Sequence, residues 1–218
     1  MKNNTPRPRG RPRAFDRDEA LAKAAETFWR LGYEGASIAD LTAAMGITPQ
    51  SLYAAFSSKA DLYREALAWY QVHIGAWAVE ALADPDVGAA LTRLLRDAAR
   101  EFTRPDHPHG CMVSTAVLTC AVENAPVARH VSGLREATIG IIRARIERGI
   151  AEGQFRPDTD AGALARFVGA MIQGMSVQAQ DGASEGALAA LAEHAIAEIA
   201  RRRMENPDRL PHPAKGFI

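Results

Sequence analysis

The chain has 218 residues, 47% of them hydrophobic, which is enough to bury the core of one large domain or two small ones. It carries 26 basic and 26 acidic side chains, so its net charge of zero argues neither for nor against a polyanionic partner. No apolar run approaches the roughly 18 to 20 residues that a membrane span requires, and the polar N-terminus has no signal-peptide core. We therefore expect a cytoplasmic protein with no membrane partner.

The charge is unevenly distributed along the chain. Residues 1–13 contain five basic side chains and no acidic one, whereas residues 65–218 contain 16 basic and 19 acidic side chains. The N-terminal segment is too polar and too rich in proline to fold alone. We interpret it as a flexible basic arm in which Arg11 and Arg13 contact the minor groove or phosphate of DNA. A solvated tail without function is the alternative.

The stretch from residue 37 to 59, SIADLTAAMGITPQSLYAAFSSK, predicts two short helices joined by a tight turn, with a third helix starting at its end. Ser37 and Asp40 have the spacing of a capping box, and Gly46 is a helix stop. Thr48 then caps the second helix and Pro49 occupies its first position. The pattern is that of a helix-turn-helix.

The outer face of the second short helix carries amides and hydroxyls and no acidic side chain, which suits a DNA groove. Gln50 and Ser51 are predicted to contact base edges, with Gln50 able to pair with adenine through two hydrogen bonds. Thr48, Tyr53 and Lys59 are predicted to contact phosphates, which fixes the register without reading sequence. The complete set of predicted DNA-binding residues is Arg11, Arg13, Ser37, Thr48, Pro49, Gln50, Ser51, Tyr53 and Lys59.

This region resembles the DNA-binding domain of the TetR family of bacterial regulators. The shared elements are Gly-Ile-Thr at 46–48, Tyr-x-x-Phe at 53–56 and Ser-Lys-x-x-Leu at 58–62, and the resemblance covers roughly residues 14–67. Thr42 stands where the family usually has alanine, and Ala55 where it usually has histidine or tyrosine. The resemblance implies an all-α fold of about nine helices, in which a three-helix helix-turn-helix domain precedes a larger helical ligand-binding and dimerisation domain.

Apolar periodicity and helix-breaking residues divide the remaining chain. We place the arm at 1–13, the helix-turn-helix domain at 14–60, the ligand-binding and dimerisation domain at 61–205 and a tail at 206–218. Helices are predicted at about 16–32, 58–83, 86–103, 111–123, 126–152, 160–180 and 184–204. In the first of these, Phe28 and Leu31 are predicted to pack against the helix-turn-helix. The helix over 58–83 is long enough to belong to both domains and to couple them, and the one over 111–123 is predicted to be central and buried.

A small-molecule pocket is implied in the larger domain by the family resemblance, and helices there offer apolar walls with scattered polar groups. The alternative for each of these residues is a place in a filled core. The candidate pocket residues are Trp69, Tyr70, His73, Trp77, Met112, Thr115, Thr119, Met171 and Gln173.

The resemblance also implies a homodimer in which the last two helices pair with their twofold mates, whereas periodicity alone is equally consistent with packing inside one chain. The candidate interface residues are Leu164, Phe167, Val168, Met171, Leu188, Leu191, Ala195, Ile196 and Ile199.

We found no pattern that predicts an enzyme, a cofactor or a metal. Asp106, His107 and His109 share one loop, but a proline separates the histidines and no third histidine or CxxC motif follows. Ser114 lacks the context of a nucleophile elbow. Cys111 follows a glycine and two histidines, and either a thiol sensor or a small buried side chain fits this position.

The sequence therefore predicts a ligand-responsive transcriptional repressor. It would act as a homodimer on a near-palindromic double-stranded DNA operator and be released by a small, partly apolar effector. Two alternatives remain: a DNA-bound nucleoid or division protein without an effector, and a thiol-based redox-sensing repressor that uses Cys111.

Overall fold

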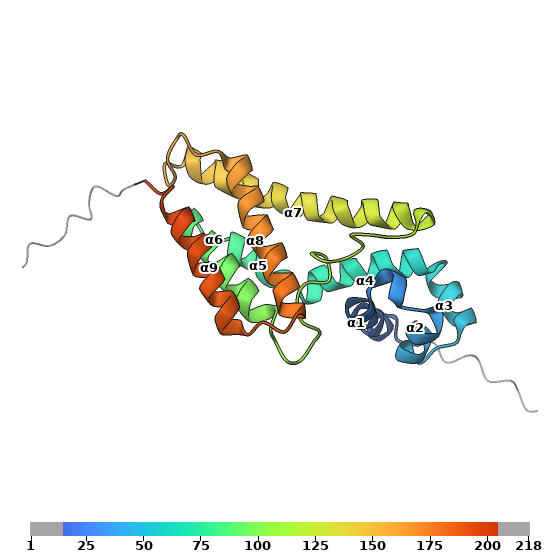
Figure 1. Cartoon of the computed structure of the whole chain (residues 1–218). Coiled ribbons are helices and arrows are strands. Elements are labelled where there is room, and N and C mark those ends of the chain that lie inside the picture. The colour runs from blue at the N-terminus through green and yellow to red at the C-terminus, as the bar shows by residue number, and fades with distance from the viewer. Residues whose placement is uncertain (1–14, 205–218) are drawn as a thin grey trace, which may run out of the picture.

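The computed structural model describes residues 15–204, and this part of the chain is helical apart from one isolated β-bridge between Phe155 and Arg203. Its nine α-helices and one 3-10 turn are α1 (Arg17–Gly35), α2 (Ile38–Met45), α3 (Pro49–Phe56), α4 (Lys59–His73), α5 (Ala76–Leu82), α6 (Val87–Glu101), η1 (Val122–Asn124), α7 (Ala125–Ala151), α8 (Ala161–Gln180) and α9 (Glu185–Ala200). The predicted all-α fold of about nine helices is confirmed for the described residues. Helices α1–α4 gather at one end of the molecule, and α7 extends from the other end over α4 (Figure 1). No helix within residues 15–204 has the length and apolar character needed to cross a membrane.

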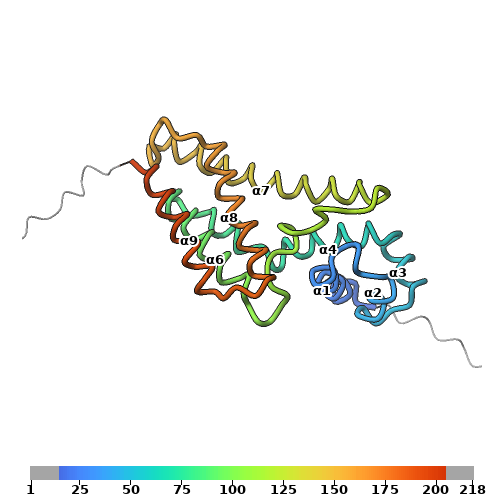
Figure 2. The backbone as a smooth tube through the Cα atoms, viewed as in Figure 1, coloured from blue at the N-terminus to red at the C-terminus, as the bar shows by residue number. Residues whose placement is uncertain are grey.

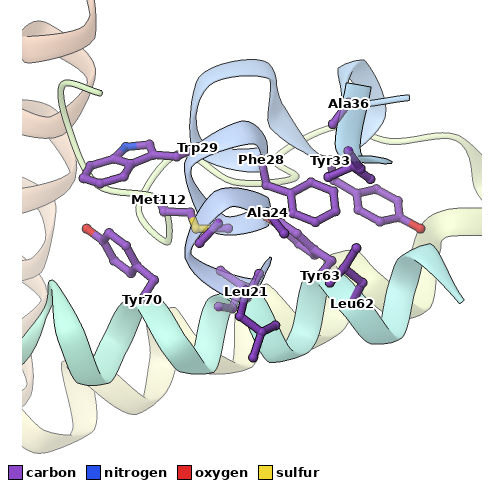
Figure 3. Packing of buried hydrophobic residues seen from close by; sticks show 14 of the residues in the cluster. Leu21, Ala24, Phe28, Trp29, Tyr33, Ala36, Leu62, Tyr63, Tyr70 and Met112 are labelled. Atoms are coloured by element: carbon purple, nitrogen blue, oxygen red, sulfur yellow. The ribbon is translucent and has the colours of Figure 1, made fainter. Parts of the chain in front are cut away.

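An aromatic cluster between α1 and α4 holds the N-terminal helices together. Phe28 is 2% exposed, and its ring meets Tyr63 nearly edge-on with the centroids 4.8 Å apart. Trp29 meets Tyr70 in the same way at 4.9 Å, with Met112 between the two helices (Figure 3). Such aromatic pairs contribute about 0.5–1.5 kcal/mol each beyond the burial of their area.

Leu31 was predicted to share this core, and that prediction is wrong, because its side chain is 45% exposed. The reason is local. Gly32 leaves the helical conformation at φ 71°, and the chain turns so that Tyr33, not Leu31, is buried. The Tyr33 ring lies 5.0 Å from that of Tyr63.

The helix-turn-helix is built as its capping residues predict. The Ser37 hydroxyl accepts from the Asp40 N–H at 3.1 Å while the Asp40 carboxylate accepts from the Ser37 N–H at 2.9 Å, which is the predicted capping box. Gly46 ends α2 at φ 68°, a conformation open to glycine at little cost. Thr48 caps α3 through the Ser51 N–H, and Pro49 begins the helix.

The single helix predicted over residues 58–83 is two helices. α4 ends at His73 and α5 begins at Ala76. The N–H groups of Ile74 and Gly75 both donate to the Tyr70 carbonyl at 2.9 Å, so the regular i to i−4 ladder stops there. Glycine lowers the stability of a helix interior by about 1 kcal/mol relative to alanine, which favours the break at this position. The shared element is therefore α4 alone, which begins at Lys59 and reaches the cavity wall at Tyr70 and Gln71.

The central buried helix predicted over residues 111–123 is also wrong. Residues 111–121 form irregular turns, η1 follows, and Leu118 and Val122 are 66% and 89% exposed. Side chains from elsewhere capture the backbone: Ser176 accepts from the Cys111 N–H at 2.8 Å, and Arg135 donates to the carbonyls of Val113 and Ala116. The two carbonyls are therefore engaged outside a helix, and the Cys111 N–H, which would have no partner at the start of a helix, is held by α8. The smooth trace of Figure 2 shows this segment running between the two ends of the molecule, from α6 toward the start of α7.

A second apolar core joins α5, α6, α7, α8 and α9. Its fully buried side chains include Leu91, Leu95, Ile142, Val168 and Ile199. The irregular segment 111–121 contributes to the first core through Met112 and Val113, and Cys111 packs against both cores. This segment therefore connects the helix-turn-helix end to the larger helical body.

Candidate DNA-binding face and internal cavity

Helix α3 presents one face to solvent because its other face is anchored. Leu52 and Phe56 are 0% and 2% exposed and fix α3 to the first core. Gln50 is exposed, and Tyr53 is 49% exposed. α3 contains no acidic side chain, so this face offers hydrogen-bonding groups without repelling phosphate.

The first turn of α3 brings the predicted contact residues together, but they differ in how many of their polar groups are already hydrogen-bonded within the protein. Thr48 and Pro49 are exposed and Ser51 is half-buried. The Thr48 hydroxyl oxygen accepts from the Ser51 N–H at 3.2 Å and lies 3.0 Å from the Ser51 hydroxyl. Within the described hydrogen bonds the Gln50 amide makes none, so both of its polar atoms are available to a base edge. Ser37, also exposed, uses its hydroxyl in the cap of α2.

Lys59 lies at the first position of α4, where a helix N-terminus favours phosphate. Its ammonium lies 4.7 Å from the centre of the Tyr33 ring, a cation–π arrangement that positions the side chain. Burial lowers the pKa of Lys59, and the Glu34 carboxylate opposes that change. Arg11 and Arg13 lie outside the described residues.

A cavity of about 190 Å³ lies inside the larger helical body. Its wall is formed mainly by α4–α8 and by the irregular segment after α6. The lining residues are Tyr70, Gln71, Gly75, Trp77, Ala78, Val79, Leu82, Leu94, Phe102, Cys111, Val113, Ser114, Arg135, Thr138, Ile139, Ile141, Ile142, Gly169, Ile172 and Gln173. An apolar wall with a few polar groups is the usual composition of a small-molecule site.

Three of the nine predicted pocket residues, Tyr70, Trp77 and Gln173, line this cavity. Burial raises the pKa of Tyr70 well above its ordinary value, and the neighbouring Cys111 thiol acts in the same direction. Tyr70 is therefore a neutral hydroxyl at physiological pH, and it adds a hydrogen-bonding group without charge.

The other six predicted pocket residues do not line it. Met112 and Thr115 face a more open hollow of about 630 Å³ between α1 and residues 108–117. Trp69 and His73 stack on each other with ring centroids 4.5 Å apart, and the His73 ring is exposed. Thr119 is exposed in the irregular segment. Met112, Thr115 and Thr119 were assigned on the assumption of a helix over 111–123 that the structure does not form. Trp69 and His73 lie on α4 as predicted, but not on the part of its surface that lines the cavity. Met171, on α8, packs against the second core.

Sequence reasoning missed most of the cavity wall, including Leu94, Phe102, Arg135 and Ile172. Leu94 and Phe102 carried no signal that separates a cavity wall from a filled core. Arg135 did carry one, because it interrupts the buried stripe of α7 one turn after Val131. A charge at such a position needs a partner or a function.

Five of the nine predicted dimer residues face the core of their own chain. These are Leu164, Val168, Leu188, Ala195 and Ile199, each at most 8% exposed. Helical periodicity identifies the apolar face correctly, but α8 and α9 use that face against α6 and α7. Phe167, Met171, Leu191 and Ile196 are half-buried and are the members of the set that keep some exposed surface.

The histidines of the loop after α6 have structural surroundings. The His107 ring stacks on Trp29 with centroids 4.7 Å apart, and its Nδ1 lies 3.0 Å from the Pro108 carbonyl. Within residues 15–204, no three histidine, cysteine, aspartate or glutamate side chains lie close enough together to hold a metal ion.

A helix-turn-helix with a free recognition face, joined to a helical body, defines the class of DNA-binding transcriptional regulators, and family profiles agree. Residues 20–66 match the bacterial regulatory proteins of the tetR family, and residues 89–203 match the tetracyclin repressor-like C-terminal domain. The chain belongs to the TetR family of transcriptional regulators.

Three relatives illustrate how much of the chain is shared. The HTH-type transcriptional repressor ComR of Escherichia coli K12 is 35% identical over 81% of this chain and 85% of its own length. The repressor BdcR of the same organism is 32% identical over 87% of this chain and 93% of its own. A cysteine mutant of the TetR-family regulator CifR, solved with double-strand operator DNA, is 45% identical with a TM-score of 0.83, covering 86% of this chain and 98% of its own.

Proposed function

We infer that the protein is a transcriptional repressor that binds a near-palindromic operator as a homodimer and is released by a small effector held in the cavity. The observation that carries the proposal is the coexistence of a free α3 face and an internal cavity whose wall is continuous with the core that supports α3. Met112 and Val113 belong to that core, while Cys111 and Val113 line the cavity. A ligand acts here through its difference in affinity for the DNA-binding and released forms.

The DNA contacts of the proposal are those of α3 and its surroundings. Gln50 reads a base edge, and Ser51 assists it. Thr48, Tyr53 and Lys59 hold the backbone. Arg11 and Arg13 of the N-terminal arm add contacts to the minor groove or to phosphate. The two α3 helices of a dimer would enter successive major grooves about 34–36 Å apart.

Gln50→Ala tests the reading of sequence. We expect a loss of roughly 1–3 kcal/mol of discrimination at one base pair of each half-site, because the two-bond contact to the base is removed. The measurement is the affinity for a duplex selected from random DNA and for its single-base variants, at one salt concentration. An equal loss on every duplex would reassign Gln50 to backbone contact. Glu26→Ala, on the exposed side of α1, is the matched control and should leave both affinity and discrimination unchanged.

Phe167→Glu tests the dimer. Phe167 keeps part of its surface exposed on α8, and burying a carboxylate at an apolar interface without a partner is strongly unfavourable. We expect the variant to sediment as a monomer and to lose operator binding. Ala137→Glu, at an exposed position of α7, adds the same charge elsewhere and should leave the dimer intact. A dimeric Phe167→Glu protein would place the interface on another surface.

Effector release is tested by screening a metabolite library for compounds that raise the melting temperature and lower operator affinity. A nucleoid or division protein on the same fold would bind many dispersed sites and respond to no compound. The similarity to ComR and BdcR, both described as transcriptional repressors, favours the regulator.

A thiol-based response is the second candidate, and one observation favours it. The Cys111 sulfur is on the cavity wall beside the Tyr70 hydroxyl, where a small oxidant that enters the cavity reaches it. Operator release by hydrogen peroxide that is lost in Cys111→Ser supports this candidate. Release that survives the substitution excludes Cys111 as the sensor.

A further inference from the structure

The cavity holds an unpaired positive charge. Among the residues that line it, Arg135 alone is charged, and none of them is acidic. No carboxylate within residues 15–204 forms an ion pair with Arg135. Its guanidinium is held by carbonyls instead, with Nη1 donating to Val113 at 3.2 Å and to Ala116 at 2.8 Å. The site therefore has a cation without an anion.

The guanidinium has donors to spare. An arginine side chain carries five N–H groups in a planar fork. The described hydrogen bonds use Nη1 only, so Nε and Nη2 remain free for a further acceptor. A carboxylate is the acceptor that matches this fork, because it takes two parallel hydrogen bonds and neutralises the charge. Arg135 is half-buried, and beside an apolar wall such a pair is stronger than in bulk solvent.

The rest of the cavity favours a hydrocarbon body. Trp77 and Phe102 form a T-shaped pair with centroids 6.0 Å apart, and Leu94, Ile142 and Ile172 complete an apolar wall. Cavities of about 150 Å³ are known to hold benzene, so 190 Å³ accommodates a ring or a branched chain of similar size.

The polar and apolar side chains that α7 contributes to the cavity wall lie along one face of this helix. Arg135, Thr138, Ile139 and Ile142 all line the cavity and follow the i, i+3, i+4, i+7 spacing. Arg135 and Ile142 are therefore separated by roughly 10 Å along the helix axis. That length suits an elongated molecule with its acidic group at one end.

We propose that the effector is a small apolar monocarboxylate whose carboxylate pairs with Arg135 and whose hydrocarbon body lies among Trp77, Phe102 and Ile142. The proposal rests on the function proposed above and specifies its ligand. It also gives the ligand a route to the DNA-binding end. The carbonyls that Arg135 holds belong to the irregular segment, in which Met112, Val113 and Ala116 pack in or against the core that contains Trp29 and Tyr63. A carboxylate on Nε and Nη2 and those carbonyls on Nη1 share one guanidinium, so a movement of the Arg135 side chain toward the ligand changes how the segment is held to α7.

The test uses the full-length protein and five acids paired with their neutral primary amides. The acids are benzoate, phenylacetate, 3-phenylpropanoate, hexanoate and cyclohexanecarboxylate. Binding is measured by calorimetry without DNA, and operator release is measured separately. We expect at least one acid to bind about tenfold or more tightly than its amide, the factor that a charge-assisted hydrogen-bond pair supplies. Equal binding of every acid and its amide, or no binding by any acid, overturns the proposal.

Two substitutions at Arg135 and one matched control test whether the preference for the acid over its amide comes from Arg135. Arg135→Met should abolish the preference for the acid, and Arg135→Lys should retain part of it because the charge remains. Arg143→Met removes an arginine from the exposed side of the same helix, where it pairs with Glu147, and should keep the full preference. Circular dichroism checks that each variant is folded. If Arg135→Met fails to fold, the Arg135→Lys and Arg143→Met proteins still decide: equal acid preference in the two overturns the role of Arg135.

The two measurements separate the ligand class from the function. Release of the operator by neutral amides as well as by acids keeps the repressor proposal and overturns the monocarboxylate. Tight acid binding that leaves operator affinity unchanged keeps the site and overturns its regulatory role.

Discussion

Phe28→Ala is expected to lower the free energy of unfolding by about 3–5 kcal/mol, the usual cost of deleting a buried aromatic ring. Phe28 is 2% exposed and meets Tyr63 edge-on, so removal of its ring leaves a void between α1 and α4. Domains of this kind have a total stability of about 5–15 kcal/mol, and the loss is a large part of it. Since α2 and α3 rest on the same core, operator binding should fall as well. Denaturation by guanidinium and a binding titration at 25 °C measure the two effects.

Leu31→Ala is the matched control for that experiment. Leu31 lies three residues further along α1 but is 45% exposed. Surface substitutions of this kind usually change stability by no more than about 0.5 kcal/mol. If Leu31→Ala were as destabilising as Phe28→Ala, the arrangement of the N-terminal core described here would be wrong.

The second large effect is expected at Gly110, where the irregular segment begins. Its φ of +80° disfavours any side chain, and a Cβ would lie 2.7 Å from the Ser176 carbonyl oxygen of α8. Gly110→Ala should therefore push the segment away from α8 and disturb the hydrogen bond from the Cys111 N–H to Ser176. Strain and overpacking together should lower the unfolding free energy by about 2–4 kcal/mol.

The cavity should change with it, because Cys111 and Val113 of this segment form part of its wall. We expect Gly110→Ala to shift the effector concentration required for operator release, measured with any compound that releases the wild-type protein. Gly153→Ala is the control: its φ is +72°, but nothing lies within 4 Å of the added Cβ. Backbone strain alone should cost it about 1–2 kcal/mol. Equal losses in the two variants would show that contact with α8 contributes nothing.

Phe28 and Gly110 lie at the two ends of one connection between the helix-turn-helix and the cavity. The helix-turn-helix is supported by α1 and α4, and the segment after α6 reaches that support from the cavity. The Glu34 carboxylate of α1 accepts from the Ala121 N–H at 3.1 Å and from the Asn124 side chain at 2.8 Å, which ties the far end of the segment to α1. The cavity wall is therefore connected to α1, which supports α3, through packed and hydrogen-bonded groups.

The sequence by itself determined the helix-turn-helix, because its signals are local. A cap at Ser37, a left-handed stop at Gly46 and a cap with proline at Thr48-Pro49 act within a few residues, and the structure reproduces each of them. The helices α6 to α9 followed in the same way from apolar periodicity and from flanking breakers, within a few residues at each end.

Only the tertiary structure decided the parts that depend on distant partners. Residues 111–121 have the apolar composition of a buried helix, but Arg135 and Glu34 take backbone groups that a helix would need, and Ser176 holds the start of the segment on α8. Periodicity identified which face of α8 and α9 is apolar without showing that α6 and α7 already cover it. The cavity depends on five helices at once, so the sequence analysis did not single out Arg135, and folding placed it on the cavity wall.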